Sequence, residues 1–205
     1  MPSPKVIAII PARMASERFP GKPLVKLCGH TMIEHVYRRV CKAVLVNDVY
    51  VATCDTEIQK VAMSFGAKVI MTSNEHKRGT DRVAEAATKV DADYIYNVQG
   101  DEPTIDPKTL TSAIKYIKKN PNIKCLQFIS KIADIQSFEN PNIVKAVKCD
   151  NGTVVNFARQ IKLKEANKSI KDIFKQLGIY LFKKSFLLEF VSWSETELEV
   201  SESID

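Results

Sequence analysis

The sequence lacks any long hydrophobic segment. No stretch of its 205 residues approaches the ~20 consecutive apolar residues that a transmembrane helix requires. Only about six apolar residues precede Pro11, too few for the core of a signal peptide. We therefore expect a cytoplasmic protein. The apolar fraction of 45% and charged fraction of 26% are ordinary for a globular chain, which argues against a disordered or fibrous protein.

Cysteine is also scarce. The five cysteines are odd in number and widely spaced, and no C-x-x-C pair occurs. This pattern favours reduced thiols over a disulfide framework or a zinc site.

Several common catalytic and binding motifs are missing. No G-x-G-x-x-G follows the first apolar run, and Lys22 follows a single glycine and precedes Pro23, so neither a dinucleotide-binding turn nor a Walker loop is indicated. The three histidines have no metal-ligand spacing. No convincing Ser-His or Cys-His pairing suggests nucleophilic catalysis.

Positive charge is present in moderate excess, with 30 Lys and Arg against 24 Asp and Glu. Much of the excess is lysine scattered through residues 115–183, without a basic face interleaved with aromatic residues, so a nucleic-acid binder is not indicated. An anionic small substrate accounts for the charge equally well.

Short apolar runs alternate with helical patterns in the first part of the chain. We expect strands at 6–10, 49–53, 68–71 and 94–98, and helices at 32–40, 57–65, 81–90 and 107–120. Such alternation requires parallel pairing with right-handed crossovers, which predicts an α/β three-layer sandwich with a mainly parallel sheet. Thr31 is the expected cap of the first helix, either Thr80 or Asp81 that of the third, and Gly66 closes the second.

The pattern changes after residue 125. Strands are expected at 125–129, 144–149, 154–157 and 178–182, with a turn at 150–153, and they suggest a small antiparallel region. Residues 165–174 are expected to form a lysine-rich surface segment and residues 184–193 a helix. A further helical pattern begins at Leu198 just before the sequence stops, so we expect the domain to be incomplete or completed by a partner. We expect a single domain over 1–205, with 1–125 and 126–205 as its two parts.

Three cations follow the first strand. Arg13, Arg18 and Lys22 flank the Pro20-Gly21 pair, which can bend the backbone so that they converge on one polyanion. The pattern is typical of a phosphate-binding loop, and a basic surface loop is the alternative.

Polar residues also follow two later strands, at Arg78 to Arg82 and at the carboxylate pair Asp101-Glu102. The carboxyl ends of parallel strands share one edge of the sheet, where ligands bind. Cations for a polyphosphate and an Asp for a hard divalent ion suit phosphoryl or nucleotidyl transfer, because that chemistry depends on positioning and charge neutralisation. A strand-to-helix turn with a cap is the alternative for Asp101-Glu102-Pro103.

Together these segments resemble one family, the 3-deoxy-manno-octulosonate (Kdo) cytidylyltransferases. The motifs are Pro11-Ala12-Arg13-x-x-Ser16-x-Arg18-Phe19-Pro20-Gly21-Lys22-Pro23-Leu24, Gly79-Thr80-Asp81-Arg82, Asn97-Val98-Gln99-Gly100-Asp101-Glu102-Pro103 and Asn140-Pro141-Asn142-Ile143-Val144-Lys145. Shorter matches are Phe157-Ala158-Arg159, Leu177-Gly178-Ile179-Tyr180 and the segment from Leu198 to Asp205. The chain resembles the sialic-acid synthetases less.

The resemblance implies transfer of a cytidylyl group from CTP to the anomeric hydroxyl of Kdo, giving CMP-Kdo and pyrophosphate for lipopolysaccharide biosynthesis. It implies Mg²⁺ as cofactor and a homodimer, without nucleic acid or membrane as partner. The implied catalytic residues are Lys22, Arg13 and Asp101, with Asp101 as the metal ligand. The implied CTP-binding residues are Ala12, Arg13, Ser16, Arg18, Lys22, Arg78, Thr80, Arg82 and Gln99. The implied sugar-acid-binding residues are Arg159, Gln176, Tyr180 and Glu199. Residues 1–125 would then bind the nucleotide, and 126–205 the sugar acid and the second subunit.

The sequence departs from the family pattern at several points. Gln176 stands where the family has His, and Ile161-Lys162 where it has Ile-Pro. Family chains continue beyond the helix at Leu198 with further core elements and a second metal-binding Asp. Two alternatives therefore remain: the same transfer to a related sugar acid such as the 8-amino analogue of Kdo, or a shortened relative that binds the nucleotide without turnover.

Overall fold

A computed structural model describes residues 3–15, 19–161, 172–202 and 204. The chain divides into two compact units. Unit 1 comprises residues 1–126 and 179–193, and unit 2 comprises residues 127–178 and 194–205. The expected division near residue 125 placed 179–193 with the second part, whereas that segment lies in unit 1.

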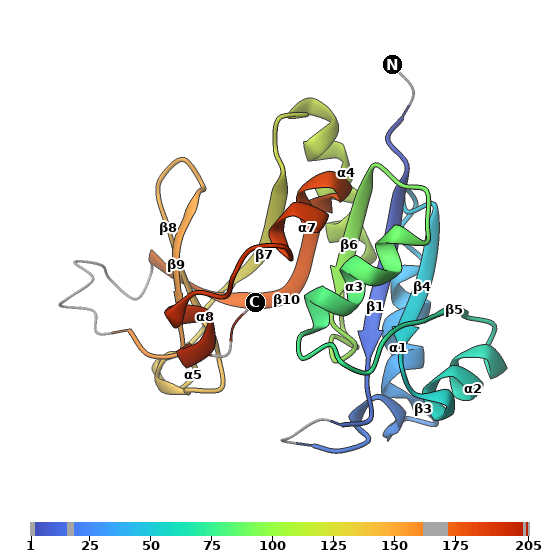
Figure 1. Cartoon of the computed structure of the whole chain (residues 1–205). Helices are drawn as coiled ribbons and strands as arrows, with labels where there is room; N and C mark the ends of the chain where they lie inside the picture. Colours follow the sequence, from blue (N-terminus) through green and yellow to red (C-terminus); the bar gives the residue numbers. More distant parts are fainter. Residues whose placement is uncertain (1–2, 16–18, 162–171, 203, 205) are drawn as a thin grey trace. The chain divides into compact units, whose positions relative to one another are not determined.

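Unit 1 is built on a parallel sheet (Figure 1). Its strands follow the order β5 (Lys68–Met71), β4 (Asp48–Thr53), β1 (Val6–Ala12) and β6 (Tyr94–Val98). The end of β10 (Ile173–Lys183) pairs antiparallel with β6. Every residue of β1 is buried, as its continuous apolar sequence predicts for a strand covered on both faces. The predicted α/β fold with a mainly parallel sheet is confirmed.

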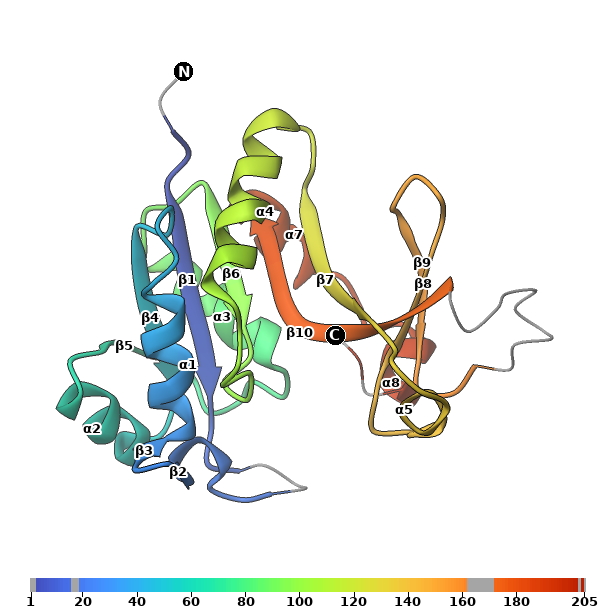
Figure 2. The same cartoon turned by 180° about the vertical axis from the view of Figure 1, so that it is seen from behind.

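Helices cover both faces of this sheet (Figures 1 and 2). They are α1 (Met32–Val40), α2 (Thr56–Ser64), α3 (Gly79–Thr88), α4 (Pro107–Lys119) and α7 (Lys184–Phe190). α3 and α7 lie on one face, and α1 and α4 on the other. Because side chains alternate along a strand, Ile7 and Ile9 of β1 point to the same face, where they share a core with Val83 and Leu187. α7 ends at Phe190, earlier than the predicted 193.

β1 extends through Pro11, where the sequence predicted its end. Its pairing with β6 covers only Val6 to Ile9, whereas its pairing with β4 continues to Ala12. At Pro11 the strand therefore has one partner, and proline is tolerated where a strand has an unpaired side.

The helix caps differ in part from the predictions. Thr31 occupies the N-cap position of α1, but its buried hydroxyl makes no hydrogen bond, so the predicted side-chain cap is wrong. Arg78 precedes α3, which places Thr80 and Asp81 inside the first turn and makes that cap prediction wrong as well. Gly66 has φ +85° and follows α2 as predicted. Its N–H donates a hydrogen bond to the Met63 carbonyl, as is typical of a helix that ends at a C-terminal glycine.

A short 3-10 helix η1 (Lys22–Leu24) and a two-stranded hairpin, β2 (Lys26–Leu27) with β3 (His30–Thr31), precede α1 and were not predicted. The hairpin turn needs left-handed backbone at Cys28 and Gly29, with φ +48° and +88°. Strands of two residues are too short to give a periodic signal.

Unit 2 is antiparallel where β8 pairs with β9 and with the first part of β10, as predicted. Its complete elements are α5 (Ile135–Glu139), β8 (Lys145–Lys148), β9 (Val154–Ala158) and α8 (Glu197–Glu202). Two strands are shared with unit 1: β7 (Cys125–Lys131) belongs to unit 2 from residue 127 onward, and β10 belongs to it up to residue 178. β10 begins at Ile173, so the predicted strand at 178–182 was too short. Residues 165–171 of the predicted lysine-rich segment lie outside the described residues.

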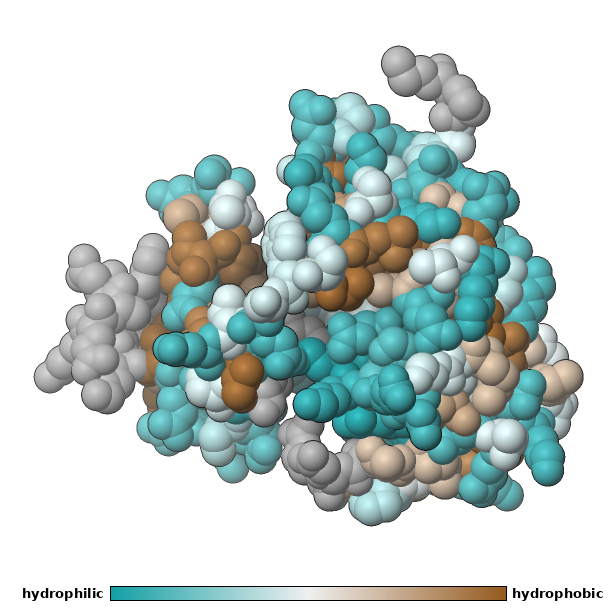
Figure 3. All heavy atoms as spheres, in the orientation of Figure 1, coloured by the Kyte–Doolittle hydropathy of each residue, from teal (hydrophilic) through white to brown (hydrophobic). Residues whose placement is uncertain are grey.

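The surface seen in Figure 3 is mainly hydrophilic, with hydrophobic patches between the polar residues. Within the described ranges, no helix is both long and apolar enough to cross a bilayer. All five cysteines are free thiols, as predicted. Burial raises the pKa of the Cys125 thiol to about 12, which keeps it protonated and unreactive at neutral pH.

Candidate active site

The parallel strands of unit 1 end at one edge of the sheet, and polar residues follow each end. Arg13 follows β1, Asp55 follows β4, Thr72 follows β5, and Gln99 follows β6. The parallel registers place these four ends on the same side. Because ligands of open α/β sheets bind outside the carboxyl ends of the strands, this edge is the candidate site.

The loop after β1 is held by Asp55. The Asp55 carboxylate (Oδ2) accepts a hydrogen bond of 2.8 Å from the Met14 N–H, and the Met14 carbonyl accepts one of 3.0 Å from the Gly21 N–H. Gly21 has φ +73°, a left-handed conformation that favours glycine. The bend predicted at Pro20-Gly21 is therefore present, and it leads directly into Lys22 at the start of η1.

Lys22 and Asp101 form an ion pair across the edge. The Lys22 ammonium (Nζ) lies 2.5 Å from the Asp101 carboxylate (Oδ2), and the two side chains are 34% and 46% exposed. The pair joins the predicted phosphate loop to the predicted metal ligand, although the two residues are 79 positions apart. A ligand can reach both groups because both retain solvent access.

Gly100 brings the Asp101 turn close to the end of β1. A Cβ at Gly100 would lie 3.0 Å from the carbonyl oxygen of Pro11 and 3.4 Å from Cδ1 of Ile33. Since a backbone oxygen cannot rotate away, only glycine allows this approach without a shift. The glycine of the Gln99-Gly100-Asp101 segment thus contributes by its lack of a side chain.

The N-terminus of α3 lies against the end of β6. Gln99 packs on Gly79, where a Cβ would lie 2.9 Å from the Gln99 amide nitrogen. The buried Asn97 donates a hydrogen bond of 3.0 Å to the Thr80 hydroxyl, and Gln99 donates one of 3.3 Å to the side-chain oxygen of Asn97. Two of the predicted nucleotide-binding residues, Thr80 and Gln99, are therefore brought together through Asn97, which the sequence interpretation did not single out.

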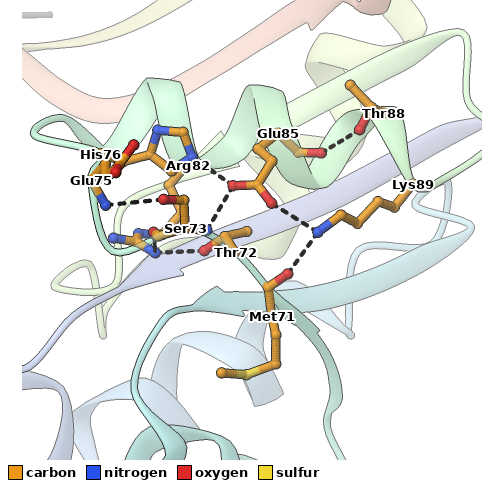
Figure 4. Close-up of polar contacts among 9 residues, drawn as sticks. All are labelled: Met71, Thr72, Ser73, Glu75, His76, Arg82, Glu85, Thr88 and Lys89. Carbon is orange, nitrogen blue, oxygen red and sulfur yellow. Dashed lines mark hydrogen bonds and ion pairs between the residues drawn. The ribbon is translucent and has the colours of Figure 1, made fainter.

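Arg82 lies deeper than a surface binding residue. It is 2% exposed, and its Nη1 donates to the Thr72 hydroxyl at 2.5 Å and to the Ser73 carbonyl at 3.0 Å (Figure 4). These bonds connect α3 to the segment after β5. The structure thus gives Arg82 a role in holding that segment, whereas its predicted contact with the nucleotide stays a prediction.

The remaining nucleotide-site predictions fall in three places. Ala12 is buried at the end of β1, Arg13 is exposed directly after it, and Arg78 is partly buried before α3. Ser16 and Arg18 lie outside the described residues.

Magnesium suits Asp101 in its ligand chemistry. Within the described ranges, no group of three or more His, Cys, Asp or Glu side chains could hold a metal ion by protein ligands alone. Mg²⁺ commonly uses one or two carboxylates together with phosphate oxygens and waters. A single exposed carboxylate beside a predicted phosphate loop fits that pattern.

The predicted sugar-binding residues are divided between the units. Tyr180 belongs to unit 1, where it is buried and stacks on Phe182. Arg159, Gln176 and Glu199 belong to unit 2. Glu199 forms a capping box with Thr196: its carboxylate accepts a hydrogen bond of 2.6 Å from the Thr196 N–H, and its own N–H donates to the Thr196 hydroxyl. The T-x-x-E spacing was a local signal for this contact.

Arg159 lies in a polar cluster of unit 2. Its Nε donates to the carbonyl oxygen of Glu202 at 2.6 Å, and its backbone N–H donates to the Glu202 carboxylate at 2.8 Å. Lys145, which is fully buried, donates to the carbonyl oxygens of Asn140 and Arg159 at 2.7 and 2.6 Å. Burial lowers the pKa of the Lys145 ammonium, and the neighbouring Arg159 lowers it further.

An α/β fold with cations and a carboxylate at the carboxyl edge of its sheet is an arrangement that nucleotidyltransferases use, and sequence comparison specifies which kind. The chain belongs to the cytidylyltransferase family, whose model matches residues 7–205.

Within that family the chain belongs with the 3-deoxy-manno-octulosonate cytidylyltransferases. It is 41% identical to the enzyme of that name from Trichlorobacter lovleyi and 39% identical to the one from Geobacter sulfurreducens, in each case over 98% of this chain and 84% of the relative. A solved structure described as CMP:2-keto-3-deoxy-manno-octonic acid synthetase complexed with CTP is 34% identical, with a TM-score of 0.88 over 98% of this chain and 83% of that chain. A cytidylyltransferase from Leptospira borgpetersenii, 22% identical with a TM-score of 0.64 over 95% of this chain and 67% of that chain, shares the fold.

Proposed function

We propose that this protein transfers the cytidylyl group of CTP to the anomeric hydroxyl of Kdo, giving CMP-Kdo and pyrophosphate for lipopolysaccharide biosynthesis. The observation that carries the proposal is the Lys22–Asp101 pair at the carboxyl edge, in a chain 41% identical to an enzyme of this name. The names of the relatives do not favour the 8-amino sugar or a protein without turnover.

In the proposed reaction Arg13 and Lys22 bind the triphosphate together with Ser16 and Arg18 of the same sequence motif. The anomeric oxygen of Kdo forms a bond to the α-phosphorus, the bond to the bridging oxygen of the pyrophosphate breaks, and the hydroxyl proton passes to solvent. Lys22 neutralises charge on the departing pyrophosphate, since catalysis of this kind depends on positioning and electrostatic stabilisation. Hydrogen bonds through Asn97 connect Thr80 and Gln99. These two residues and Arg78 are proposed to contact the cytidine.

Asp101 would hold Mg²⁺ together with phosphate oxygens and waters. The ion supplies positive charge at the phosphates. With the nucleotide and the ion bound, Lys22 and Asp101 would exchange their mutual contact for a phosphate oxygen and the ion, respectively. The partial exposure of both side chains supports this exchange.

The assignment of Arg159, Gln176, Tyr180 and Glu199 to binding of the sugar acid stays a prediction. The fork of an arginine suits its carboxylate. We also propose that the protein is cytoplasmic and forms a homodimer. Light scattering tests the homodimer, and a monomer at micromolar concentration would contradict it.

The decisive experiment measures pyrophosphate release from CTP. We expect turnover that requires both Kdo and Mg²⁺, and a loss of kcat on the order of 100-fold in Asp101→Ala, comparable to removal of one strong electrostatic contact. Asp150→Ala, which removes an exposed carboxylate in unit 2, is the matched control and should retain wild-type rates. Full activity of Asp101→Ala would exclude the metal role, and turnover only with the 8-amino analogue would reassign the substrate.

A further inference from the structure

The segment from Thr72 to Arg78 connects β5 to α3 and leads directly to residues proposed to bind the cytidine. Two side chains of α3, Arg82 and Glu85, contact it (Figure 4). Glu85 has no role in the proposed reaction, yet both of its carboxylate oxygens accept hydrogen bonds.

The Glu85 carboxylate connects three parts of the chain. Its Oε2 accepts a bond of 2.8 Å from the Ser73 N–H and lies 2.6 Å from Nε2 of His76. Its Oε1 accepts a bond of 2.8 Å from the Lys89 ammonium, which also donates to the Met71 carbonyl at 2.7 Å. Glu85 thus fixes two residues of the segment to α3, while Lys89 fixes the carboxylate to the end of β5.

These contacts have the features of a rigid support. The side chains of His76 and Glu85 are only 22% and 27% exposed, so solvent competes weakly for their bond. The Ser73 N–H is partly buried, so loss of its acceptor leaves it with incomplete hydrogen bonding, and this makes the segment sensitive to the carboxylate. His76 precedes Arg78 by two residues, so its position limits where Arg78 can lie.

We propose that Glu85 is a positioning residue for recognition of the cytidine base. Its carboxylate holds the segment from Ser73 to His76 against α3, and this places Arg78 at the N-terminus of that helix beside Thr80. The inference rests on the proposed function, because it takes the base to lie there. Glu85 acts through the segment and does not touch the nucleotide.

The kinetic test compares Glu85→Ala, Glu85→Gln and the control Glu57→Gln, which alters an exposed glutamate in the first turn of α2. Glu85→Ala should raise KM for CTP on the order of tenfold, since loss of ~1.4 kcal/mol of binding is a factor of ten. It should change kcat little and reduce the preference for CTP over UTP. Glu85→Gln, which keeps an acceptor oxygen for Ser73, should recover part of both effects. A fall in kcat alone, or an unchanged CTP preference, would overturn the proposal.

A second measurement is independent of turnover. Amide hydrogen exchange in residues 72–78 should be faster in Glu85→Ala than in the wild type, while exchange in α4 stays the same. If Glu85→Ala does not fold, the same comparison is made with Glu85→Gln. If the wild type releases no pyrophosphate from CTP and Kdo, the proposed function fails. The affinities of the wild type and of the Glu85 variant for CTP, measured by calorimetry, still decide the inference in that case. Unchanged exchange in the segment would refute it in every case.

Discussion

Substitution of Gly100 by alanine should damage both stability and turnover for a steric reason. The new Cβ would lie 3.0 Å from the Pro11 carbonyl, so the turn that carries Asp101 must shift by a few tenths of an ångström. Overpacking costs about 1–3 kcal/mol, and the lower entropy of the unfolded chain offsets about 0.4–1 kcal/mol. The middle of these two ranges gives a net loss of about 1.3 kcal/mol, which corresponds to a fall in Tm of about 3–5 °C for a chain of this size.

The functional consequence follows from the neighbouring residue. A shift of the turn changes the position of Asp101 relative to Lys22, with which it now forms a contact of 2.5 Å. We therefore expect pyrophosphate release to fall as well. Calorimetric Tm and the rate of CTP turnover are measured on the same preparation. A Gly100→Ala protein with wild-type Tm and wild-type rate would refute the steric argument.

Gly66 provides the matched control, because it is glycine for a different reason. It has φ +85°, and a Cβ there would meet nothing within 4 Å. Gly66→Ala should lose about 1–2 kcal/mol through left-handed strain and retain turnover. Gly66→Asn should be more stable than Gly66→Ala, since asparagine tolerates this conformation. Asparagine should not rescue position 100, where space is limiting; rescue there would contradict the assignment.

Three further outcomes are expected. Tyr96→Phe should lower the free energy of unfolding by about 1 kcal/mol, measured by urea titration, because it deletes the buried hydrogen bond to the Leu110 carbonyl; an unchanged midpoint would contradict this. The bond from Lys89 lowers the pKa of Glu85 from its ordinary value of 4.5 to about 2, helped by the Ser73 N–H and His76. The unfolded chain therefore binds the proton more tightly, and this stabilising contribution is complete above pH 4.5 and is lost as the pH falls toward 2. Urea midpoints at pH 7 and pH 3 should differ less in Glu85→Gln than in the wild type, and equal differences would exclude the effect. Lys145→Met should destabilise unit 2 by about 1–3 kcal/mol per carbonyl left without a donor, seen as faster hydrogen exchange in β8; unchanged exchange would show that the carbonyls find other partners.

The sheet of unit 1 could be predicted because its signals are local. Apolar runs marked β1, β4, β5 and β6, and the helical spacing between them implied parallel pairing. Elements without such a signal were missed, including the hairpin of β2 and β3 and the short helix α5. β10 was predicted too short because its first residues, from Ile173, were assigned to a lysine-rich segment.

The candidate site was predictable in its place and less so in its contacts. Arg13, Arg78 and Asp101 follow the ends of predicted strands. We expected them at one edge of the sheet, because parallel strands have their carboxyl ends on the same side. The support of Asp55 for Met14, and that of Glu85 for the Ser73 segment, left no pattern in the sequence. Each joins residues on separate elements, and only folding brings those elements together.

The sequence by itself determined the α/β class of this protein, the strand ends that carry its polar residues, and a motif series that places it in its family. These features depend on periodicity and on the chemistry of neighbouring residues, which the linear order contains. Only the tertiary structure decided that Lys22 pairs with Asp101, that Gly100 is needed for space, and that Arg82 and Glu85 brace the segment before α3. Those contacts join distant positions, and their geometry depends on how helices and strands pack, which no local pattern encodes.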